Sequence, residues 1–213
     1  MQIATFCFNP FFENTYIVYN GEKEAWIIDP GCMTQAEEEV LIDFLDSGSL
    51  KPVRLLLTHA HIDHILGCAF LFEKYGLLAE MHVQEEMLMQ TAGSIAGMYG
   101  IPYRASKWNK NFLFEGQDLL LGDQVWRTIW CPGHSPGSLC FYQGDEGVLI
   151  AGDVLFDGSI GRTDLPGGDH DTLIRSIREK LFVLSNATKV FPGHGGPTTI
   201  GKEKMTNPFL QEE

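Results

Sequence analysis

The feature that most constrains this chain is a run of four potential metal ligands within six residues, His59-Ala60-His61-Ile62-Asp63-His64. The run follows Thr58 and the mainly apolar residues 53–57, which have the length and composition of a buried strand. Residues two apart on a helix point in nearly opposite directions, so His59 and His61 could share one ion only on a loop. The run therefore predicts a tight loop at the end of a strand, where imidazole and carboxylate groups can bind zinc, iron or manganese.

Three later residues follow the same placement rule. His134, Asp153 and His194 each come just after a predicted strand, and each is preceded directly by a glycine. Functional side chains are concentrated on loops that a rigid scaffold positions. An isolated histidine is usually structural, but five of the seven histidines lie in the dense run or at these strand ends. The set therefore predicts one shared metal site.

The rest of the pattern predicts strands in groups, with helices between the groups. Strands are expected at residues 3–8, 15–19, 25–28, 53–57, 78–81, 119–121, 125–130, 138–143, 147–151 and 187–191. Helices are expected from the Thr34/Glu37 capping box to Gly48, at residues 64–75, 83–98 and 171–184, and after Gly201. This order fits an α/β (α+β) fold with two packed sheets and helices on both outer faces. Because no repeat or low-complexity linker interrupts the chain, we expect one domain over residues 1–213.

Composition excludes several classes of partner. A net charge of -13 disfavours nucleic acid, because an acidic surface repels phosphates. The five cysteines include no Cys-x-x-Cys pair, which indicates a reducing compartment without a disulfide framework. The sequence shows neither a signal peptide nor an apolar run of about 18 residues, the usual minimum for a membrane span. We therefore expect a soluble, cytoplasmic protein that does not contact a membrane, and the sequence makes no prediction of its oligomeric state.

Together these motifs resemble the metallo-β-lactamase fold superfamily, and the resemblance covers the chain from Asp29 to His194 in the family's order. It implies a four-layer αββα sandwich with two divalent metal ions at one edge of the sheets, zinc first among the metals, with iron or manganese as alternatives. By the family's pattern, the first ion has three ligands, the second ion has three, and one residue bridges both. These are, in that order, His59, His61 and His134; Asp63, His64 and His194; and Asp153.

Details of the sequence narrow the branch of the family. Class B lactamases usually have cysteine at the position of Asp153, which argues against antibiotic hydrolysis. Flavin-linked diiron relatives have glutamate at the position of His61, which argues against that branch. The segment 153–164 resembles glyoxalase II-like thioesterases and also persulfide dioxygenases. The C-terminal segment 199–210 resembles the short bacterial type of glyoxalase II-like protein.

The resemblance implies a hydrolase with a dinuclear metal site that cleaves a small-molecule thioester such as S-lactoylglutathione. A hydroxide shared by the two ions would be the nucleophile at neutral pH, and Asp63 would accept its remaining proton. A thiol has a pKa near 8.5 and can leave without a separate acid. Three alternatives stay open: a mononuclear iron persulfide dioxygenase, a lactone or other ester hydrolase, and a non-catalytic metal-binding protein. The last would be expected to lack at least one ligand.

Three further residues are expected to support the site. Asp29 resembles the family's carboxylate that orients a ligand histidine, and Thr58 could bond within the ligand loop. Arg162 stands where the family has a substrate-binding lysine and could pair with a substrate carboxylate. Asp164, however, replaces the family's tyrosine, and the chain ends at Glu213 without the C-terminal helical domain of full-length glyoxalase II enzymes. Tight binding of glutathione is therefore not predicted.

Overall fold

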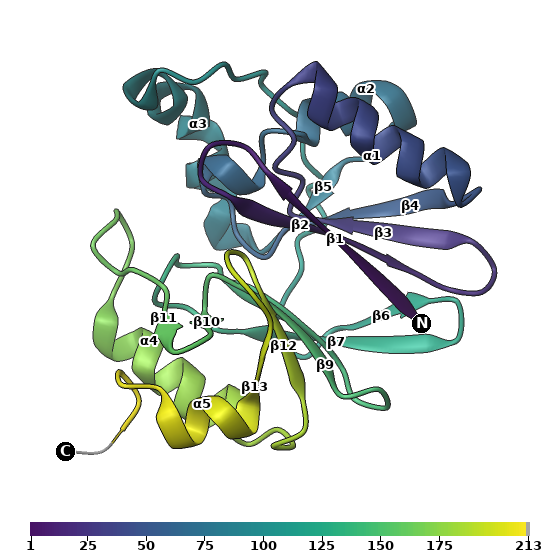
Figure 1. Ribbon diagram of the computed structural model, residues 1–213. Helices are drawn as coiled ribbons and strands as arrows, with labels where there is room; N and C mark the ends of the chain where they lie inside the picture. The colour runs from purple at the N-terminus through teal and green to yellow at the C-terminus, as the bar shows by residue number, and fades with distance from the viewer. Residues whose placement is uncertain (212–213) are drawn as a thin grey trace.

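Two β-sheets form the centre of the structure, a computed structural model that describes residues 1–211 (Figure 1). The first sheet has the strand order β1-β2-β3-β4-β5, with antiparallel pairing from β1 to β3 and parallel pairing from β3 to β5. Its strands are β1 (Gln2–Phe8), β2 (Glu13–Tyr19), β3 (Glu24–Ile28), β4 (Lys51–Leu56) and β5 (Ala79–Glu80).

The second sheet has the order β13-β12-β9-β8-β7-β6, and among its neighbouring strands only β9 and β12 pair in parallel. Its strands are β6 (Asp118–Leu121), β7 (Gln124–Trp130), β8 (Leu139–Gln143), β9 (Val148–Gly152), β12 (Lys189–Pro192) and β13 (Thr198–Thr199). A separate two-stranded hairpin follows β9 and comprises β10 (Leu155–Phe156) and β11 (Ser159–Ile160).

Helices cover the outer face of each sheet, as Figure 1 shows. Those on the first sheet are α1 (Gln35–Ser47), α2 (Cys68–Tyr75) and α3 (Glu86–Tyr99), with the 3₁₀ turns η1 (Ile62–His64) and η2 (Val83–Glu85). Those on the second sheet are α4 (His170–Ser176), its π-helical continuation η3 (Ile177–Leu181), and α5 (Ile200–Thr206). The predicted αββα sandwich is confirmed.

Alternation along the central strands explains the four layers. In β3, Ala25 and Ile27 pack in the core beneath the helices, whereas Trp26 and Ile28 pack in the core between the sheets. Trp26 meets Trp126 of the second sheet there, with ring centroids 5.9 Å apart. Because successive side chains of a strand point to opposite faces, a strand buried on both faces reads as a continuous apolar run. The apolar runs of the sequence therefore become the inner strands of the sandwich.

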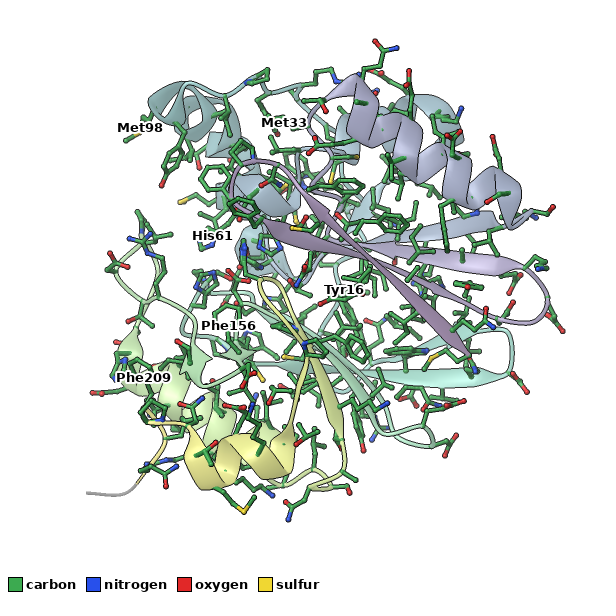
Figure 2. All side chains as sticks on the ribbon, in the orientation of Figure 1. Tyr16, Met33, His61, Met98, Phe156 and Phe209 are labelled. Atoms are coloured by element: carbon green, nitrogen blue, oxygen red, sulfur yellow. The ribbon has the colours of Figure 1, made fainter. Side chains whose placement is uncertain are left out.

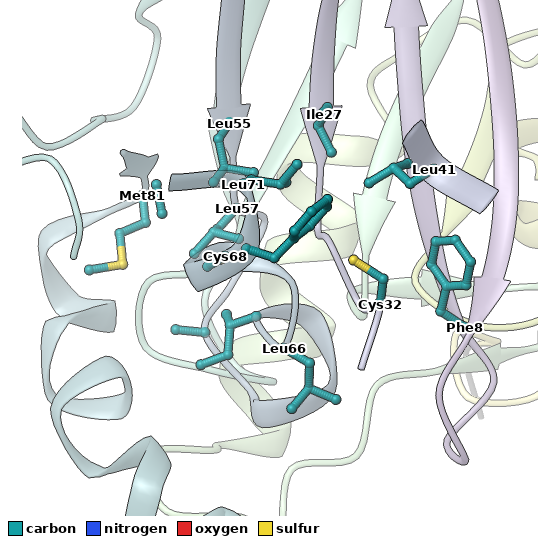
Figure 3. Packing of buried hydrophobic residues seen from close by; sticks show 14 of the residues in the cluster. Phe8, Ile27, Cys32, Leu41, Leu55, Leu57, Leu66, Cys68, Leu71 and Met81 are labelled. Atoms are coloured by element: carbon teal, nitrogen blue, oxygen red, sulfur yellow. The ribbon is translucent and has the colours of Figure 1, made fainter. Parts of the chain in front are cut away.

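The core beneath the helices of the first sheet includes Leu57 and Leu66, which flank the run of candidate ligands (Figure 3). Leu55 of β4 and Leu57, the residue directly after β4, are fully buried in this core together with Leu71 of α2. Leu57 is the last apolar residue before the run that begins at Thr58 and His59. The start of the ligand loop is thus attached to a rigid part of the fold.

Element boundaries agree with the sequence predictions except at a few positions. The Thr34/Glu37 capping box is present, and α1 ends at Gly48 as predicted. The helix predicted at residues 64–75 is wrong in its first turn, because the Gly67 amide donates to the Pro30 carbonyl and α2 begins only at Cys68. The two-residue strands β10, β11 and β13 were not predicted, since two residues carry no readable periodicity.

Two further observations concern the helices and the cysteines. No helix within residues 1–211 is both long enough and apolar enough to cross a membrane. All five cysteines are free: four are buried, and Cys7 is exposed.

Candidate metal centre

The predicted ligands come together at one edge of the sandwich, between the two sheets. Figure 2 labels His61 of the first sheet's loop and Phe156 of the β10–β11 hairpin at this edge. The loop after β4 supplies four ligand-type side chains, and three loops of the second sheet supply the others. Within residues 1–211, the side chains that can share an ion include the sets His59, His61, His134 and Asp63, His64, His194, each with ligand atoms within 4.8 Å of one another.

The first set consists of three imidazoles with converging nitrogens. His61 Nδ1 lies 2.8 Å from His134 Nε2, and His134 Nε2 lies 3.2 Å from His59 Nε2. Two nitrogens bound tetrahedrally to one zinc ion at about 2.0–2.1 Å would be roughly 3.3 Å apart. The observed spacings are close to that value, so these residues can hold a tetrahedral ion with only small adjustments.

The second set combines a carboxylate with two imidazoles. Asp63 Oδ2 lies 3.2 Å from His194 Nε2 and 3.7 Å from His64 Nε2. These separations also suit donors around a common cation, since oxygen and nitrogen ligands bind at about 2.0–2.2 Å.

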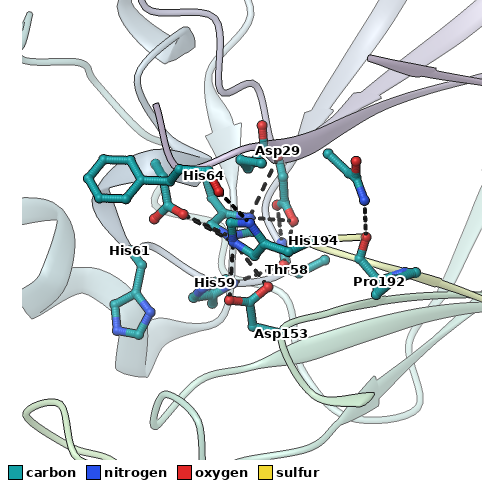
Figure 4. A network of polar contacts seen from close by, with 12 residues as sticks. Asp29, Thr58, His59, His61, His64, Asp153, Pro192 and His194 are labelled. Atoms are coloured by element: carbon teal, nitrogen blue, oxygen red, sulfur yellow. Dashed lines mark hydrogen bonds and ion pairs between the residues drawn. The ribbon is translucent and has the colours of Figure 1, made fainter. Parts of the chain in front are cut away.

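Asp153 contacts both sets, and Figure 4 shows it near His64 and His194. Its Oδ2 is 3.5 Å from His134 Nε2 of the first set and 3.5 Å from His194 Nε2 of the second. Its Oδ1 is 3.6 Å from His64 Nε2. One carboxylate therefore reaches both sets, as the predicted bridging role requires.

Hydrogen bonds to Nδ1 fix the tautomers of His59 and His64. The Thr58 hydroxyl donates to Asp29 Oδ2 (2.5 Å), so it can only accept from His59 Nδ1, 3.0 Å away. Asp29 Oδ2 also accepts from His64 Nδ1 at 3.1 Å. Both histidines therefore present an unprotonated Nε2 to the centre when they are neutral. Asp29 and Thr58 thus lie where the sequence analysis predicted.

Backbone carbonyls fix the tautomers of His134 and His194, the other two histidines that present Nε2 to the centre. His134 Nδ1 donates to the Arg162 carbonyl at 2.8 Å. His194 Nδ1 lies 3.0 and 3.2 Å from the carbonyl oxygens of Phe11 and Phe12, which can only accept. His61 differs, because its Nδ1 is the nitrogen that faces the other ligands.

Asp29 itself is oriented to support rather than to coordinate. It also lies within ligand distance of His59 and His64. Its Oδ1, however, accepts from the Thr58 amide at 2.7 Å, and its Oδ2 accepts from two side chains. Its backbone is in the left-handed region, with φ of 50°. Such a conformation persists only where the surroundings fix it, and here the bonds to Thr58 and His64 occupy both carboxylate oxygens.

The electrostatics of the centre favour metal ions over protons at the first set. Burial lowers the pKa of His59 and His61, to about 3 for His61, and the neighbouring imidazoles lower both further. Burial also lowers the pKa of His134. These three imidazoles are therefore neutral at neutral pH, which is the state that binds metal.

In the second set, the electrostatics favour the protonated form of a histidine. Burial alone would lower the pKa of His64, but the carboxylates of Asp63 and Asp153 outweigh it and raise that pKa well above its ordinary value. Burial raises and the His64 charge lowers the pKa of Asp153, with a net lowering. In the metal-free protein a proton on His64 thus partly compensates the two carboxylates. A bound divalent ion would supply that positive charge instead.

Unpaired buried atoms test whether a metal fits. His64 Nε2 and Asp153 Oδ1 are both buried without a hydrogen-bond partner among residues 1–211, and both point into the centre. An unpaired buried polar atom costs about 1–3 kcal/mol. Two such donors between two sets of convergent nitrogens and carboxylates fit divalent ions such as zinc, iron or manganese.

A close approach explains the glycine before His194. A Cβ at Gly193 would lie 2.1 Å from Asp153 Oδ1 and 2.7 Å from His64 Cε1. Only glycine lets the chain pass so close to two ligands of the centre. The Pro-Gly-His motif is thus a packing requirement of the site.

Sequence analysis missed the residues of β2 that hold the His194 loop. The Asn14 side chain donates to the carbonyls of Pro192 (3.0 Å) and Gly195 (2.8 Å). The Tyr16 hydroxyl donates to the Pro192 carbonyl at 2.6 Å. These contacts span more than 170 positions of the sequence, so no local pattern could have indicated them.

Arg162 lies on the segment after β11, where its backbone supports His134. Its side chain is 59% exposed and forms a bidentate pair with Asp164, with both N–O distances 2.7 Å. The structure thus pairs Arg162 with the residue that replaces the family's tyrosine.

Comparison with known proteins identifies the family. A sequence profile of the metallo-beta-lactamase superfamily matches residues 8–194. The chain belongs to this superfamily. Similar members include the hydroxyacylglutathione hydrolase GloC of Haemophilus influenzae, 37% identical over 218 aligned positions that cover 100% of both chains.

Solved structures of the superfamily agree with the fold. The crystal structure of BLEG-1, described as a B3 metallo-beta-lactamase, has a TM-score of 0.90 and 39% identity. That of TTHA1623 in a di-iron-bound form has a TM-score of 0.86 and 37% identity. Each comparison covers 99% of this chain and 100% of the other.

Proposed function

We propose that this protein is a metal-dependent hydrolase that cleaves thioesters, with S-lactoylglutathione as the first substrate to test. The observation that carries the proposal is the convergence of two ligand sets on one bridging carboxylate, Asp153. The full-length similarity to the hydroxyacylglutathione hydrolase GloC supports the choice of substrate.

The proposed ligands follow from the two sets. His59, His61 and His134 would hold one ion; Asp63, His64 and His194 would hold the other; and Asp153 would contact both. Two such ions would supply a nucleophile at neutral pH by acidifying water, and would polarise the substrate carbonyl. The di-iron form of TTHA1623 supports a capacity for two ions in a fold this similar.

We assign proton transfer to Asp63. Its side chain is 14% exposed, so it borders both the second ligand set and solvent. One of its oxygens is 3.2 Å from His194 Nε2, so the carboxylate and that imidazole face the same proposed ion site. A fixed carboxylate at the solvent boundary can take the proton released by the attacking group and pass it to water.

The leaving group is proposed to lie beside His194. An open cavity of about 280 Å³ is lined there by Phe156, Asp157, Ser159, His194, Gly195 and Gly196. A thiol with a pKa near 8.5 can leave as thiolate, so it needs no dedicated acid in this cavity. That chemistry favours a thioester over an amide.

Arg162 is proposed to contact a carboxylate of the thiol carrier. Arg162 would have to exchange Asp164 for the substrate, but the pair is exposed to solvent, and exposed ion pairs are weak. The pair is therefore a weak competitor. Replacing Arg162 with alanine should raise KM for S-lactoylglutathione and leave KM for an uncharged thioester unchanged. An equal rise for both substrates would refute this assignment.

The test of the proposed function is a substrate panel on zinc-loaded and iron-loaded protein, with Asp153→Ala as the matched inactive control. S-lactoylglutathione should be hydrolysed by the native chain and not by the variant. Turnover no faster than that of the variant would refute the proposal.

Two other classes belong in the same panel. A β-lactam is included because BLEG-1, at 39% identity, is described as a B3 metallo-beta-lactamase, although Asp153 argued against that activity. Glutathione persulfide with an oxygen electrode tests the dioxygenase alternative. A preference for either substrate would replace the thioesterase assignment while keeping the metal centre.

A further inference from the structure

A fully buried carboxylate lies behind the centre without a charged partner. Glu85 ends η2 and is 0% exposed. It forms no ion pair among residues 1–211, and burial raises its pKa. Burying such a group is costly unless its oxygens are well bonded. Neither the ligand assignment nor the proposed reaction uses this residue.

The two oxygens of Glu85 bond two different ligand loops. Oε2 accepts from the Ala60 amide at 2.7 Å. Oε1 accepts from the Ser135 hydroxyl at 2.8 Å and from the Gly137 amide at 2.6 Å. Ala60 lies between His59 and His61, and Ser135 directly follows His134.

These bonds join loops that belong to different sheets. The Ala60 loop follows β4 of the first sheet, and the Ser135 loop connects β7 and β8 of the second. One backbone bond, from the Leu139 amide to the Thr58 carbonyl at 2.8 Å, also links them. That bond joins the two loops at a single point. Glu85 supplies three more hydrogen bonds to these loops.

The absence of a side chain at Gly137 makes room for this carboxylate. A Cβ at Gly137 would lie 2.8 Å from both Cγ and Oε1 of Glu85. The close approach brings the Gly137 amide within 2.6 Å of the oxygen. The second loop is thus built around the carboxylate.

We infer that Glu85 is a positioning residue that sets the spacing of His59, His61 and His134, and thereby the metal affinity of the first ligand set. The inference rests on the proposed metal site but not on the identity of the substrate. Outer groups that orient ligands typically change metal affinity by about 10–100-fold when they are replaced.

Glu85→Gln is the sharpest perturbation, because it keeps the shape of the side chain. A glutamine offers one oxygen and one NH₂ group in place of two acceptors. The Ser135 hydroxyl can rotate to accept, but the two backbone amides cannot. Whichever way the amide is turned, the N–H of Ala60 or that of Gly137 faces another N–H.

A matched control exists on the other side of the molecule. Glu203 is also 0% exposed and also accepts from three donors, namely the Thr198 hydroxyl, the Asn207 side chain and the Gly158 amide. None of these donors is a proposed ligand or a sequence neighbour of one. Glu203→Gln therefore makes the same chemical change without touching a ligand loop.

The experiment measures metal affinity by chelator competition and the Co²⁺ absorption spectrum, on variants shown to be folded by circular dichroism. Glu85→Gln should lower the metal affinity of the first ligand set by about 10–100-fold and alter the Co²⁺ absorption bands of that set. Glu203→Gln should bind within about twofold of the native chain, as expected when no outer ligand contact is changed. Equal affinity of native protein and Glu85→Gln, or equal losses in both variants, would overturn the inference.

A second variant covers the case in which Glu85→Gln does not fold. Ser135→Ala keeps the carboxylate and both backbone donors, and it removes the bond to Glu85 together with the 2.7 Å bond between the Ser135 and Ser138 hydroxyls. It should weaken the first site by several-fold, about the lower end of the range for outer-ligand changes. Native affinity in this variant would then decide against the inference. A native chain that binds no metal would instead refute the proposed function itself.

Discussion

Replacing Thr58 with valine tests how the fold prepares a ligand before any metal binds. The hydroxyl of Thr58 donates to Asp29 and accepts from His59 Nδ1. Valine has nearly the same shape, so the change removes two hydrogen bonds and leaves no cavity. A hydrogen bond to a charged group contributes about 1.5–3 kcal/mol, and an unsatisfied buried N–H costs about 1–3 kcal/mol.

The expected loss follows from these contacts. Asp29 keeps its bonds to the Thr58 amide and to His64, which limits the damage on that side. We therefore expect metal-free Thr58→Val to lose about 3 kcal/mol of unfolding free energy, measured by urea denaturation. Because His59 loses the group that fixes its tautomer, affinity at the first set should also fall by about 10–100-fold in chelator competition.

Thr188→Val is the matched control. Thr188 is 0% exposed, like Thr58 at 1%, but its hydroxyl has no partner among residues 1–211. Its replacement should leave stability unchanged or raise it by about 1 kcal/mol, since a buried unpaired hydroxyl is removed. If Thr58→Val matched this control in both stability and metal affinity, the role given to Thr58 would be refuted.

Two other predictions concern packing and pH. Gly193→Ala should lower occupancy of the second set at least about tenfold in metal analysis at fixed free metal, because its Cβ meets Asp153 and His64. Gly196→Ala, which meets nothing within 4 Å, is its control, and equal occupancy in the two variants would contradict the packing argument. The metal-free protein should lose stability as pH falls from 6.5, because the unfolded chain protonates His61 near its ordinary pKa of 6.5, whereas the folded chain does so only near 3. His64 has a raised pKa, so its contribution is complete below pH 6.5 and does not offset that loss. Equal melting temperatures of metal-free protein at pH 6.5 and about pH 4.5 would contradict this sign.

Much of the fold could be predicted because its signals are local. The apolar runs that became β3 and β9 are continuous since both faces of those strands are buried. Ligand positions could be predicted for a related reason. A histidine or aspartate beside a glycine just after such a run is unusual, and the fold brings strand ends to one edge of the sandwich.

The supporting contacts could not be predicted, since they join distant segments. Nothing around Asn14 or Tyr16 indicates that they hold the Pro192 carbonyl. Glu85 resembles an ordinary acidic residue at the start of a helix, and only the structure shows it bonded to Ala60 and Gly137. Such contacts depend on how the two sheets are packed together, which periodicity does not encode.

Crystals of the zinc-loaded protein, measured at the zinc absorption edge, test the central claim most directly. We predict two anomalous peaks, one enclosed by His59, His61 and His134 and one enclosed by Asp63, His64 and His194, with Asp153 in contact with both. One peak alone, or a second peak outside these ligands, would contradict the account.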